Sequence, residues 1–416
     1  MRSREGRAVH VAFFNRSYHP DTSATGQLLT DLCEDLVRRH GCRVSVVAAA
    51  PPQTRGGVRV LHARGTRFSK ARFAGRACNY ATYFASACWT GLRLDRPDVV
   101  VALTDPPVIG LAAWLAARRF RAPLVMSYRD LFPEAAALVD DFHSDAVNAV
   151  LQAVNRFLAA RADRVVALGD RMRERLIADK GARPERTIVV PDWADTTAIA
   201  PGPKRNAFSD AHGLADTFVV MHSGNVGLAQ ALDALVDAAA LLRDLPDVRI
   251  VIVGDGVRRC ALQQRAAGLA LENMVFLPPQ PRASLSLSFA AADLFVVSLR
   301  RGLTGAVVPS KLYGILAAGR PYVAAMEDDS EVAALTRTRG TGLVCEPENP
   351  RALAGAIAAF YRDRTLLAAC AARARAASLD FDRATQVDKY ATLFREVAAA
   401  RRHRGARHAV AGEVTP

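Results

Sequence analysis

Short apolar segments alternate with segments of helical periodicity along nearly the whole chain. In the first half the apolar segments are residues 9–14, 44–48, 99–103, 123–127, 164–168 and 188–190, and the helical segments are 26–39, 108–119, 148–161 and 171–180. Strands that are apolar along their whole length are typical of parallel sheets covered by helices on both faces. The alternation therefore predicts an α/β fold built on a parallel sheet.

The alternation stops at residues 192–208, where Pro201 and Pro203 stand among polar neighbours, as in a linker. It then begins again, with apolar segments at 218–222, 250–253, 274–277, 294–298, 322–325 and 342–345, and helical segments at 229–242, 256–267, 310–318 and 351–362. A chain of 416 residues is also too long for one ordinary core. The sequence therefore predicts two doubly wound, Rossmann-like domains.

We place these domains at residues 1–200 and 201–383 and expect them to face each other across a cleft, where ligands of such folds commonly bind. Residues 384–403 have apolar side chains at helical spacing, which predicts a last helix that crosses back to the first domain. The tail, residues 404–416, is expected to be disordered.

Composition excludes several classes of protein. Hydrophobic residues make up 50% and charged residues 23%, which argues against a disordered polymer and a membrane bundle. No apolar stretch is long enough to predict a membrane-spanning helix. The seven cysteines include no CxxC pair, so we predict neither a disulfide framework nor a zinc site, and a reducing cytoplasm fits.

The positive charge is concentrated in one segment. The formal net charge is +14, and no Asp or Glu stands between Asp35 and Asp95. Basic residues there are Arg55, Arg59, Arg64, Arg67, Lys70, Arg72 and Arg76, followed by the aromatic residues Tyr80, Tyr83, Phe84 and Trp89. This mixture suits an anionic membrane surface or single-stranded nucleic acid. A solvated charged loop remains an alternative, and general enrichment in Arg also explains the excess.

Three glycine-bearing segments follow predicted strands. They are residues 21–27 with Gly26, residues 223–227 with Ser223, Gly224 and Asn225, and residues 253–256 with Gly254 and Asp255. Glycine permits tight turns in which backbone N–H groups approach a phosphate. Ordinary helix starts and strand-to-helix turns explain each segment at least as well when it is considered alone.

Two further segments carry charged side chains. Pro309 and Ser310 are typical of a helix start, and Lys311 would then lie in the first turn, where the helix dipole disfavours a cation. A bound diphosphate would compensate that cost. The loop after residues 123–127 contains Arg129, Asp130 and Glu134, either as site residues or as a surface ion pair.

These segments, in this order and at these distances, resemble the family 4 glycosyltransferases of the GT-B fold, over residues 9–399. The resemblance is to the branch that builds bacterial surface polysaccharides on lipid-linked precursors. It implies a reaction that retains the anomeric configuration and needs no metal or other cofactor. The donor would be a nucleotide-sugar, and we expect it to be UDP-linked.

The resemblance also implies roles for individual residues. The donor diphosphate would lie against Gly26 and the 223–225 turn, with Lys311 as its countercharge. The base would lie near Asp255 and Gln280, whereas the sugar would contact Asp130 and the helix start at Pro309 and Ser310. Asp130 and Lys311 are the predicted catalytic residues, and Arg129, Glu134 and Gly254 are further predicted binding residues.

The sequence departs from the family pattern at two places. Ala306 and Gly314 stand where the family usually has glutamates, and residues 228–230 lack the usual basic pair. How the sugar and ribose are held is therefore open. The diphosphate would depend more on Lys311, with help from Arg129, Arg300 or Arg301.

The predicted function is transfer of a hexosyl or N-acetylhexosaminyl group to a lipid-linked or polysaccharide acceptor in cell-envelope synthesis. The predicted location is cytoplasmic, at the inner face of the cell membrane, with no nucleic-acid partner. A nucleotide-sugar epimerase or hydrolase is an alternative, for which His19, Asp105, Glu134 and His222 are loose candidates. A donor-binding scaffold without activity is a third possibility.

Overall fold

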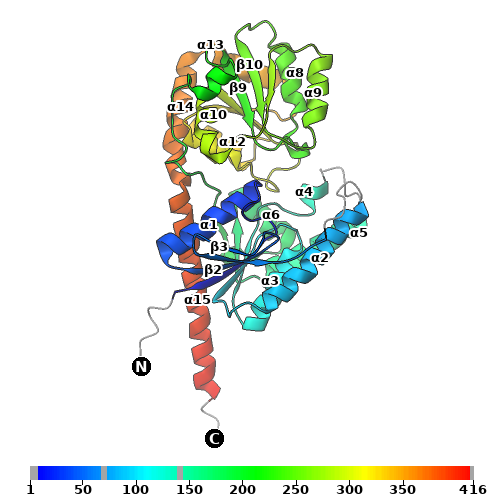
Figure 1. Cartoon of the computed structure of the whole chain (residues 1–416), viewed down its shortest axis with the longest axis vertical. Coiled ribbons are helices and arrows are strands. Elements are labelled where there is room, and N and C mark those ends of the chain that lie inside the picture. Colours follow the sequence, from blue (N-terminus) through cyan, green and yellow to red (C-terminus); the bar gives the residue numbers. More distant parts are fainter. Residues whose placement is uncertain (1–7, 67–72, 138–143, 413–416) are drawn as a thin grey trace. The chain divides into compact units, whose positions relative to one another are not determined.

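The computed structural model describes residues 8–66, 73–137 and 144–412, and the chain forms two compact units (Figure 1). The first unit comprises residues 1–133, 143–191 and 386–416, and the second comprises 134–142 and 192–385. Each unit has its own sheet flanked by helices (Figure 1). The predicted α/β class with two mainly parallel sheets is confirmed.

The first sheet has eight strands in the order β3-β4-β2-β1-β5-β6-β7-β8. They are β1 His10–Phe14, β2 Arg43–Ala48, β3 Gln53–Arg55, β4 Val58–His62, β5 Val99–Ala102, β6 Leu124–Ser127, β7 Arg164–Ala167 and β8 Thr187–Val189. Every pairing is parallel except that of β3 with β4. Strands β1, β5 and β6 are buried at every position, because helices cover both faces.

The helices of this part of the chain follow the predicted alternation. They are α1 Ala24–His40, α2 Phe73–Leu92, α3 Ile109–Phe120, α4 Glu134–Ala137, α5 Asp145–Arg161, α6 Asp170–Lys180 and the short 3₁₀ turn η2 Pro184–Arg186. Sequence analysis missed β3, β4, α2 and the short helix α4. Strand β4 escaped because exposed Arg59 interrupts its buried valines, as expected near a sheet edge.

The second sheet has six parallel strands in the order β11-β10-β9-β12-β13-β14. They are β9 Phe218–Ser223, β10 Val248–Val253, β11 Met274–Leu277, β12 Leu294–Ser298, β13 Tyr322–Ala325 and β14 Gly342–Cys345. The helices and 3₁₀ turns from residue 207 onward are α7 Ala207–Ala211, η3 Leu228–Gln230, α8 Asp233–Leu241, α9 Arg259–Gly268, η4 Arg282–Ser284, α10 Leu285–Ala291, α11 Lys311–Ala317, α12 Glu331–Arg339, α13 Pro350–Arg362, α14 Arg364–Ser378, η5 Leu379–Phe381 and α15 Arg383–Gly412.

Two predictions about helices need correction. The helix expected at residues 229–242 begins only at Asp233, because Gln230 is held in the 3₁₀ turn η3: its Oε1 accepts a hydrogen bond from the Gly227 N–H at 3.0 Å. The expected disorder of residues 404–416 is wrong as far as Gly412, where α15 ends. Residues 404–412 contain no proline and are rich in Ala and Arg, which favour helix.

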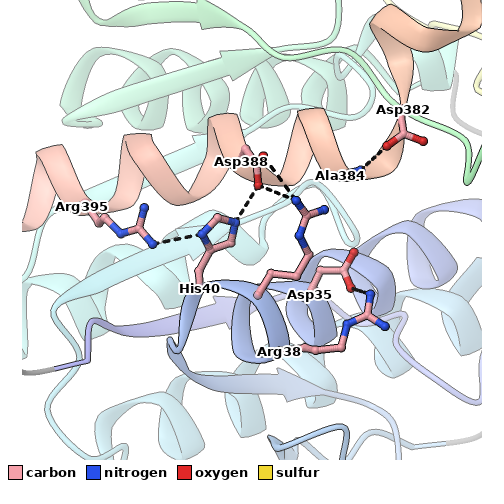
Figure 2. A network of polar contacts seen from close by, with 8 residues as sticks. Asp35, Arg38, His40, Asp382, Ala384, Asp388 and Arg395 are labelled. Carbon is pink, nitrogen blue, oxygen red and sulfur yellow. Dashed lines mark hydrogen bonds and ion pairs between the residues drawn. The ribbon is translucent and has the colours of Figure 1, made fainter.

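Helix α15 packs onto the first unit through its apolar face. Val387, Tyr390 and Phe394 are fully or almost fully buried, and the Phe394 ring meets that of Phe13 edge-on with 5.9 Å between ring centroids. Figure 2 shows polar contacts beside this face, where Asp388 lies within 2.8 Å of His40 Nε2. Among the described residues, no helix combines the length and the hydropathy of a membrane span.

The two segments that enter and leave the second unit hydrogen-bond to each other. Thr196 Oγ1 donates to the Asp382 carboxylate at 2.5 Å, and the Arg383 N–H donates to the Ala194 carbonyl at 2.9 Å. An isolated β-bridge also joins Ala194 to Asp382. These contacts fix the start of α15 to the 192–199 segment.

Candidate functional site

Two glycine turns interlock at the carboxyl ends of β9 and β10. Gly224, Gly254 and Gly256 have φ angles of +129°, +149° and +157°, which side-chain-bearing residues rarely adopt. A Cβ on Gly254 would lie 1.9 Å from the Gly224 carbonyl oxygen, and one on Gly256 would lie 2.3 Å from the Val226 carbonyl oxygen. Glycine is therefore required here by both backbone conformation and close approach, as the sequence predicts for tight turns.

Backbone hydrogen bonds connect the two turns. The N–H of Gly224 donates to the Val253 carbonyl, and that of Val226 donates to the Asp255 carbonyl, both at 2.9 Å. The Gly227 N–H is also engaged, by Gln230. The predicted approach of phosphate to this turn therefore cannot use these three N–H groups. Asn225 and Gly224 are nevertheless exposed, so side-chain and other backbone groups of the turn remain accessible.

Lys311 lies beneath the 223–225 turn. It is the first residue of α11, and Ser310 is the residue before the helix. A Cβ on Gly224 would lie 3.4 Å from Lys311 Cε and 3.5 Å from its Nζ. The same Nζ is 3.0 Å from Nε2 of His222, a fully buried residue of β9. Within the described ranges, no carboxylate forms an ion pair with Lys311.

His222 is fully buried and Lys311 half-buried, and loss of solvent changes the acid–base properties of both side chains. Desolvation lowers the pKa of Lys311 to about 7. Burial, and next the charge of Lys311, lower the pKa of His222 well below its ordinary value, although the carbonyl groups of Asn225 and Val296 oppose this shift. His222 is therefore neutral near pH 7. Lys311 can still carry a proton there, and an arriving anion would favour its charged form.

The remaining residues predicted to bind the donor also belong to the second unit. Asp255 is exposed, and its Oδ1 accepts a hydrogen bond from the Gly256 N–H at 2.8 Å. Gln280 is half-buried and donates to the Pro278 carbonyl at 3.0 Å. Pro309 and Ser310 are also half-buried. None of these residues is locked in an ion pair, so each retains groups that a ligand could contact.

The two positions without glutamate are closely surrounded by other residues. Ala306 is completely buried, and a Cβ on Gly314 would lie 2.9 Å from the Phe289 ring. The suggested supporting cations are also occupied. Arg301 pairs with Glu346 at 2.9 Å and Arg300 with Glu348 at 3.6 Å. Lys311, by contrast, lies against Gly224 and has no carboxylate partner in the described ranges.

The other predicted site residues lie in two places, after β6 and at the start of α1. Arg129 and Asp130 follow β6, and both backbone N–H groups point to Thr104 Oγ1, at 3.2 and 3.4 Å. Arg129 is buried and Asp130 half-buried, whereas Glu134 begins α4 and belongs to the second unit. Gly26 lies in the first turn of α1 rather than in a loop, and its N–H donates to Ser23 Oγ at 3.2 Å.

One charged cluster was not predicted. At the carboxyl ends of β1 and β5, Arg16 Nε lies 3.1 Å from Asp105 Oδ1, and Ser17 Oγ donates to Asp105 Oδ2 at 2.5 Å. The Arg16 guanidinium also lies over the Tyr80 ring. The position of residues 16 and 17 directly after the first strand was the available signal.

The basic segment is only partly described. Arg67, Lys70 and Arg72, and the side chain of Arg76, lie outside the described residues. Arg55 pairs with Glu34 at 2.6 Å and Arg59 with Asp95 at 2.9 Å. On α2, Trp89 is 59% exposed and the Arg93 guanidinium lies 3.8 Å from its ring centroid. The described part of the chain has no group of three His, Cys, Asp or Glu side chains that could hold a metal ion.

The chain is similar in sequence to known glycosyltransferases. The family model for a glycosyl transferase 4-like domain matches residues 24–193, and the model for glycosyl transferases group 1 matches residues 204–377. The D-inositol 3-phosphate glycosyltransferase of Nocardia farcinica is 33% identical over 319 residues, which cover 74% of this chain and 68% of that protein. The putative colanic acid biosynthesis glycosyl transferase WcaI of Escherichia coli K12 is 26% identical, over 84% of this chain and 91% of its own.

A solved structure shows the same arrangement of elements. The crystal structure of Anabaena HepE in complex with UDP-glucose matches with a TM-score of 0.73 and 20% sequence identity. The match covers 93% of this chain and 99% of HepE. At this identity the likeness shows the fold.

Proposed function

Since this chain belongs to the group 1 glycosyltransferases and has the GT-B fold, we propose that it is a retaining enzyme of cell-envelope glycan synthesis. It is a glycosyltransferase that takes its sugar from a nucleotide-sugar. The proposed donor is UDP-linked, the transferred group is a hexosyl or N-acetylhexosaminyl group, and the acceptor is lipid-linked or a polysaccharide. The similarity to WcaI, a putative colanic acid biosynthesis enzyme, supports the pathway, and the complex of HepE with UDP-glucose supports the UDP donor.

The observation that carries the donor assignment is the position of Lys311. Its amine lies beneath an exposed glycine turn and has no carboxylate partner in the described ranges. When the bond between sugar and diphosphate breaks, negative charge grows on the leaving diphosphate. A fixed cation at that oxygen stabilises the transition state more than the ground state. We assign this role to Lys311.

Asp130 is the proposed counterpart for the acceptor. It would orient the acceptor hydroxyl or stabilise positive charge at the anomeric carbon. Asp130→Asn keeps the shape and the backbone hydrogen bond to Thr104 but removes the charge. We expect turnover to fall by about 10²-fold, as for loss of an acid–base or charge-stabilising group, with UDP affinity unchanged.

The measurement is kcat with saturating donor and acceptor, alongside the dissociation constant for UDP. Glu174→Gln, which changes an exposed carboxylate of α6, is the matched control and should leave both unchanged. Turnover of Asp130→Asn within twofold of wild type would show that Asp130 has no such role.

A peripheral membrane location is also proposed. Helix α2 exposes Trp89 and Leu92, with the Arg93 guanidinium stacked on the Trp89 ring. An exposed aromatic residue beside arginines suits the interface of an anionic bilayer. A lipid-linked acceptor would be presented at such a surface, on the cytoplasmic side where nucleotide-sugars are found.

The decisive experiment combines donor and acceptor. UDP-glucose, UDP-galactose and UDP-N-acetylglucosamine are each incubated with a polyprenyl-diphosphate-linked sugar in anionic or neutral vesicles. We expect a new glycolipid of retained anomeric configuration with one donor, formed faster on anionic vesicles. UDP release without acceptor would instead indicate a hydrolase, and a changed donor sugar an epimerase. If the donor binds but no product forms with any of the donors or vesicles, the protein would be a donor-binding scaffold without activity.

A further inference from the structure

We propose that His222 is the positioning residue for Lys311: its buried imidazole holds the lysine amine beneath the 223–225 turn without cancelling the positive charge. This inference rests on the proposed donor-binding role of Lys311. It adds a residue for which sequence analysis gave only a loose role in an alternative reaction.

The imidazole of His222 is held rigidly by its position in the sheet. His222 lies in β9, where it pairs with Ile252 of β10, and the neighbouring residue Met221 pairs with Phe295 of β12. The side chain has no exposed surface. A side chain fixed in the middle strand of three has few ways to move. Its Nε2 is therefore a fixed point to which the flexible lysine chain can be anchored.

His222 Nε2 and Lys311 Nζ lie 3.0 Å apart, and the chemistry of the two groups determines which of them donates. A charged lysine amine has three N–H donors and no acceptor, so Nε2 must accept the hydrogen bond with its lone pair. The ring proton then lies on Nδ1, which has no hydrogen-bond partner among the described residues, and the Asn225 carbonyl oxygen also lies 3.3 Å from Nε2. One N–H of Lys311 is then directed at His222, and two remain for oxygens of a diphosphate above the turn.

The neutral charge of the His222 imidazole matters as well. A carboxylate at the place of His222 would form an ion pair with Lys311 and compete with the phosphate. A neutral imidazole positions the amine and leaves its full charge for the ligand. Burial keeps His222 neutral, because desolvation and the adjacent Lys311 both lower its pKa. The lowered pKa of Lys311, about 7, also fits an amine that awaits an anion.

Little space separates the Lys311 amine from the 223–225 turn. Gly224 is exposed, and a Cβ there would already touch Lys311 Cε and Nζ at 3.4 and 3.5 Å. The Lys311 amine is thus separated from the exposed backbone of Gly224 by little more than a van der Waals contact. Anchoring by His222 is what keeps it there rather than in solvent, where a free lysine would extend.

The experiment compares an acceptor-retaining and an acceptor-removing variant. His222→Gln places an amide oxygen near the position of Nε2, whereas His222→Leu fills the space with an apolar group. Each is made in the wild type and in Lys311→Met. The dissociation constants for UDP and uridine are measured by calorimetry, and unfolding temperatures show that each variant is folded.

We expect His222→Leu to weaken UDP binding by about 10-fold, as for one lost hydrogen bond to a charged group, and to leave uridine binding unchanged. His222→Gln should stay within about 3-fold of wild type. In the Lys311→Met background, His222→Leu should cause no further loss, because both changes remove one interaction.

Four results would overturn the inference. Equal losses from His222→Leu in both backgrounds, or equal effects of Leu and Gln, would mean that His222 acts only in packing. A normal UDP affinity of His222→Leu, with a weakened Lys311→Met, would remove the role of His222 while the donor proposal stands. A normal UDP affinity of Lys311→Met would overturn the donor role of Lys311 and this inference with it.

Discussion

Replacing Lys311 with methionine is expected to lower turnover by about 10²- to 10³-fold, in line with the loss of one group that stabilises the transition state. UDP affinity should fall as well. The same variant should unfold at a higher temperature than the wild type without ligand. The reason is that the amine is desolvated and has no carboxylate partner in the described ranges, so its charge costs folding free energy.

The difference in stability should depend on pH. The folded-state pKa of Lys311 is lowered to about 7, whereas an unfolded lysine titrates near 10.4. Between these values the unfolded chain binds more protons, so Lys311 makes wild-type stability rise with pH through this window. At pH 7 and below, the cost is largest. The advantage of Lys311→Met should therefore be greatest there and shrink towards pH 9.

Thermal unfolding of both proteins at pH 6, 7, 8 and 9 measures this difference, with turnover measured at pH 7. Lys389→Met is the control, because Lys389 is exposed on α15. It should change neither the pH dependence nor the activity. A pH-independent difference between Lys311→Met and wild type would contradict the depressed pKa, and normal turnover would contradict the catalytic role.

Gly254→Ala should have the largest structural effect of any single methyl group added to the second unit's turns. The new Cβ would lie 1.9 Å from the Gly224 carbonyl oxygen, at a φ of +149°. Strained backbone of this kind costs about 1–3 kcal/mol, and the clash adds to it. We expect the unfolding temperature to fall by roughly 5–10 °C and UDP binding to be lost, because Gly224 must move away from Lys311.

Gly355→Ala is the matched control for this change. Gly355 lies inside α13, and a Cβ there would meet no atom within 4 Å. Alanine should stabilise that helix by up to about 1 kcal/mol. Equal unfolding temperatures for Gly254→Ala and wild type would show that the two turns separate without cost, and the interlocked geometry would then not matter for stability.

Much of the fold could be predicted because the strands are apolar on both faces. The predicted strands at residues 274–277, 294–298 and 322–325 have the observed bounds of β11, β12 and β13. Prediction failed where the local pattern was weak. In α2, small and aromatic residues give no clear apolar stripe, and only packing against α3 reveals the helix.

The site could be predicted only in part, because several of its contacts join residues that are far apart in the sequence. Glycine turns and Lys311 stand out locally, but the partner of Lys311 is His222, 89 residues away. The pairing of Arg301 with Glu346, over 45 residues, likewise needed the folded chain. The sequence also cannot show that the Gly224 and Val226 N–H groups are used between the turns.

The division of the chain has a consequence for its synthesis on the ribosome. The core of the first unit is completed by α15, whose Val387, Tyr390 and Phe394 side chains come from the end of the chain. The N-terminal segments are made first, yet they must wait for these residues to emerge. Most of the second unit is one uninterrupted stretch, residues 192–385, so it can finish folding earlier. A truncated chain that stops before α15 would therefore leave the first-made half exposed to aggregation.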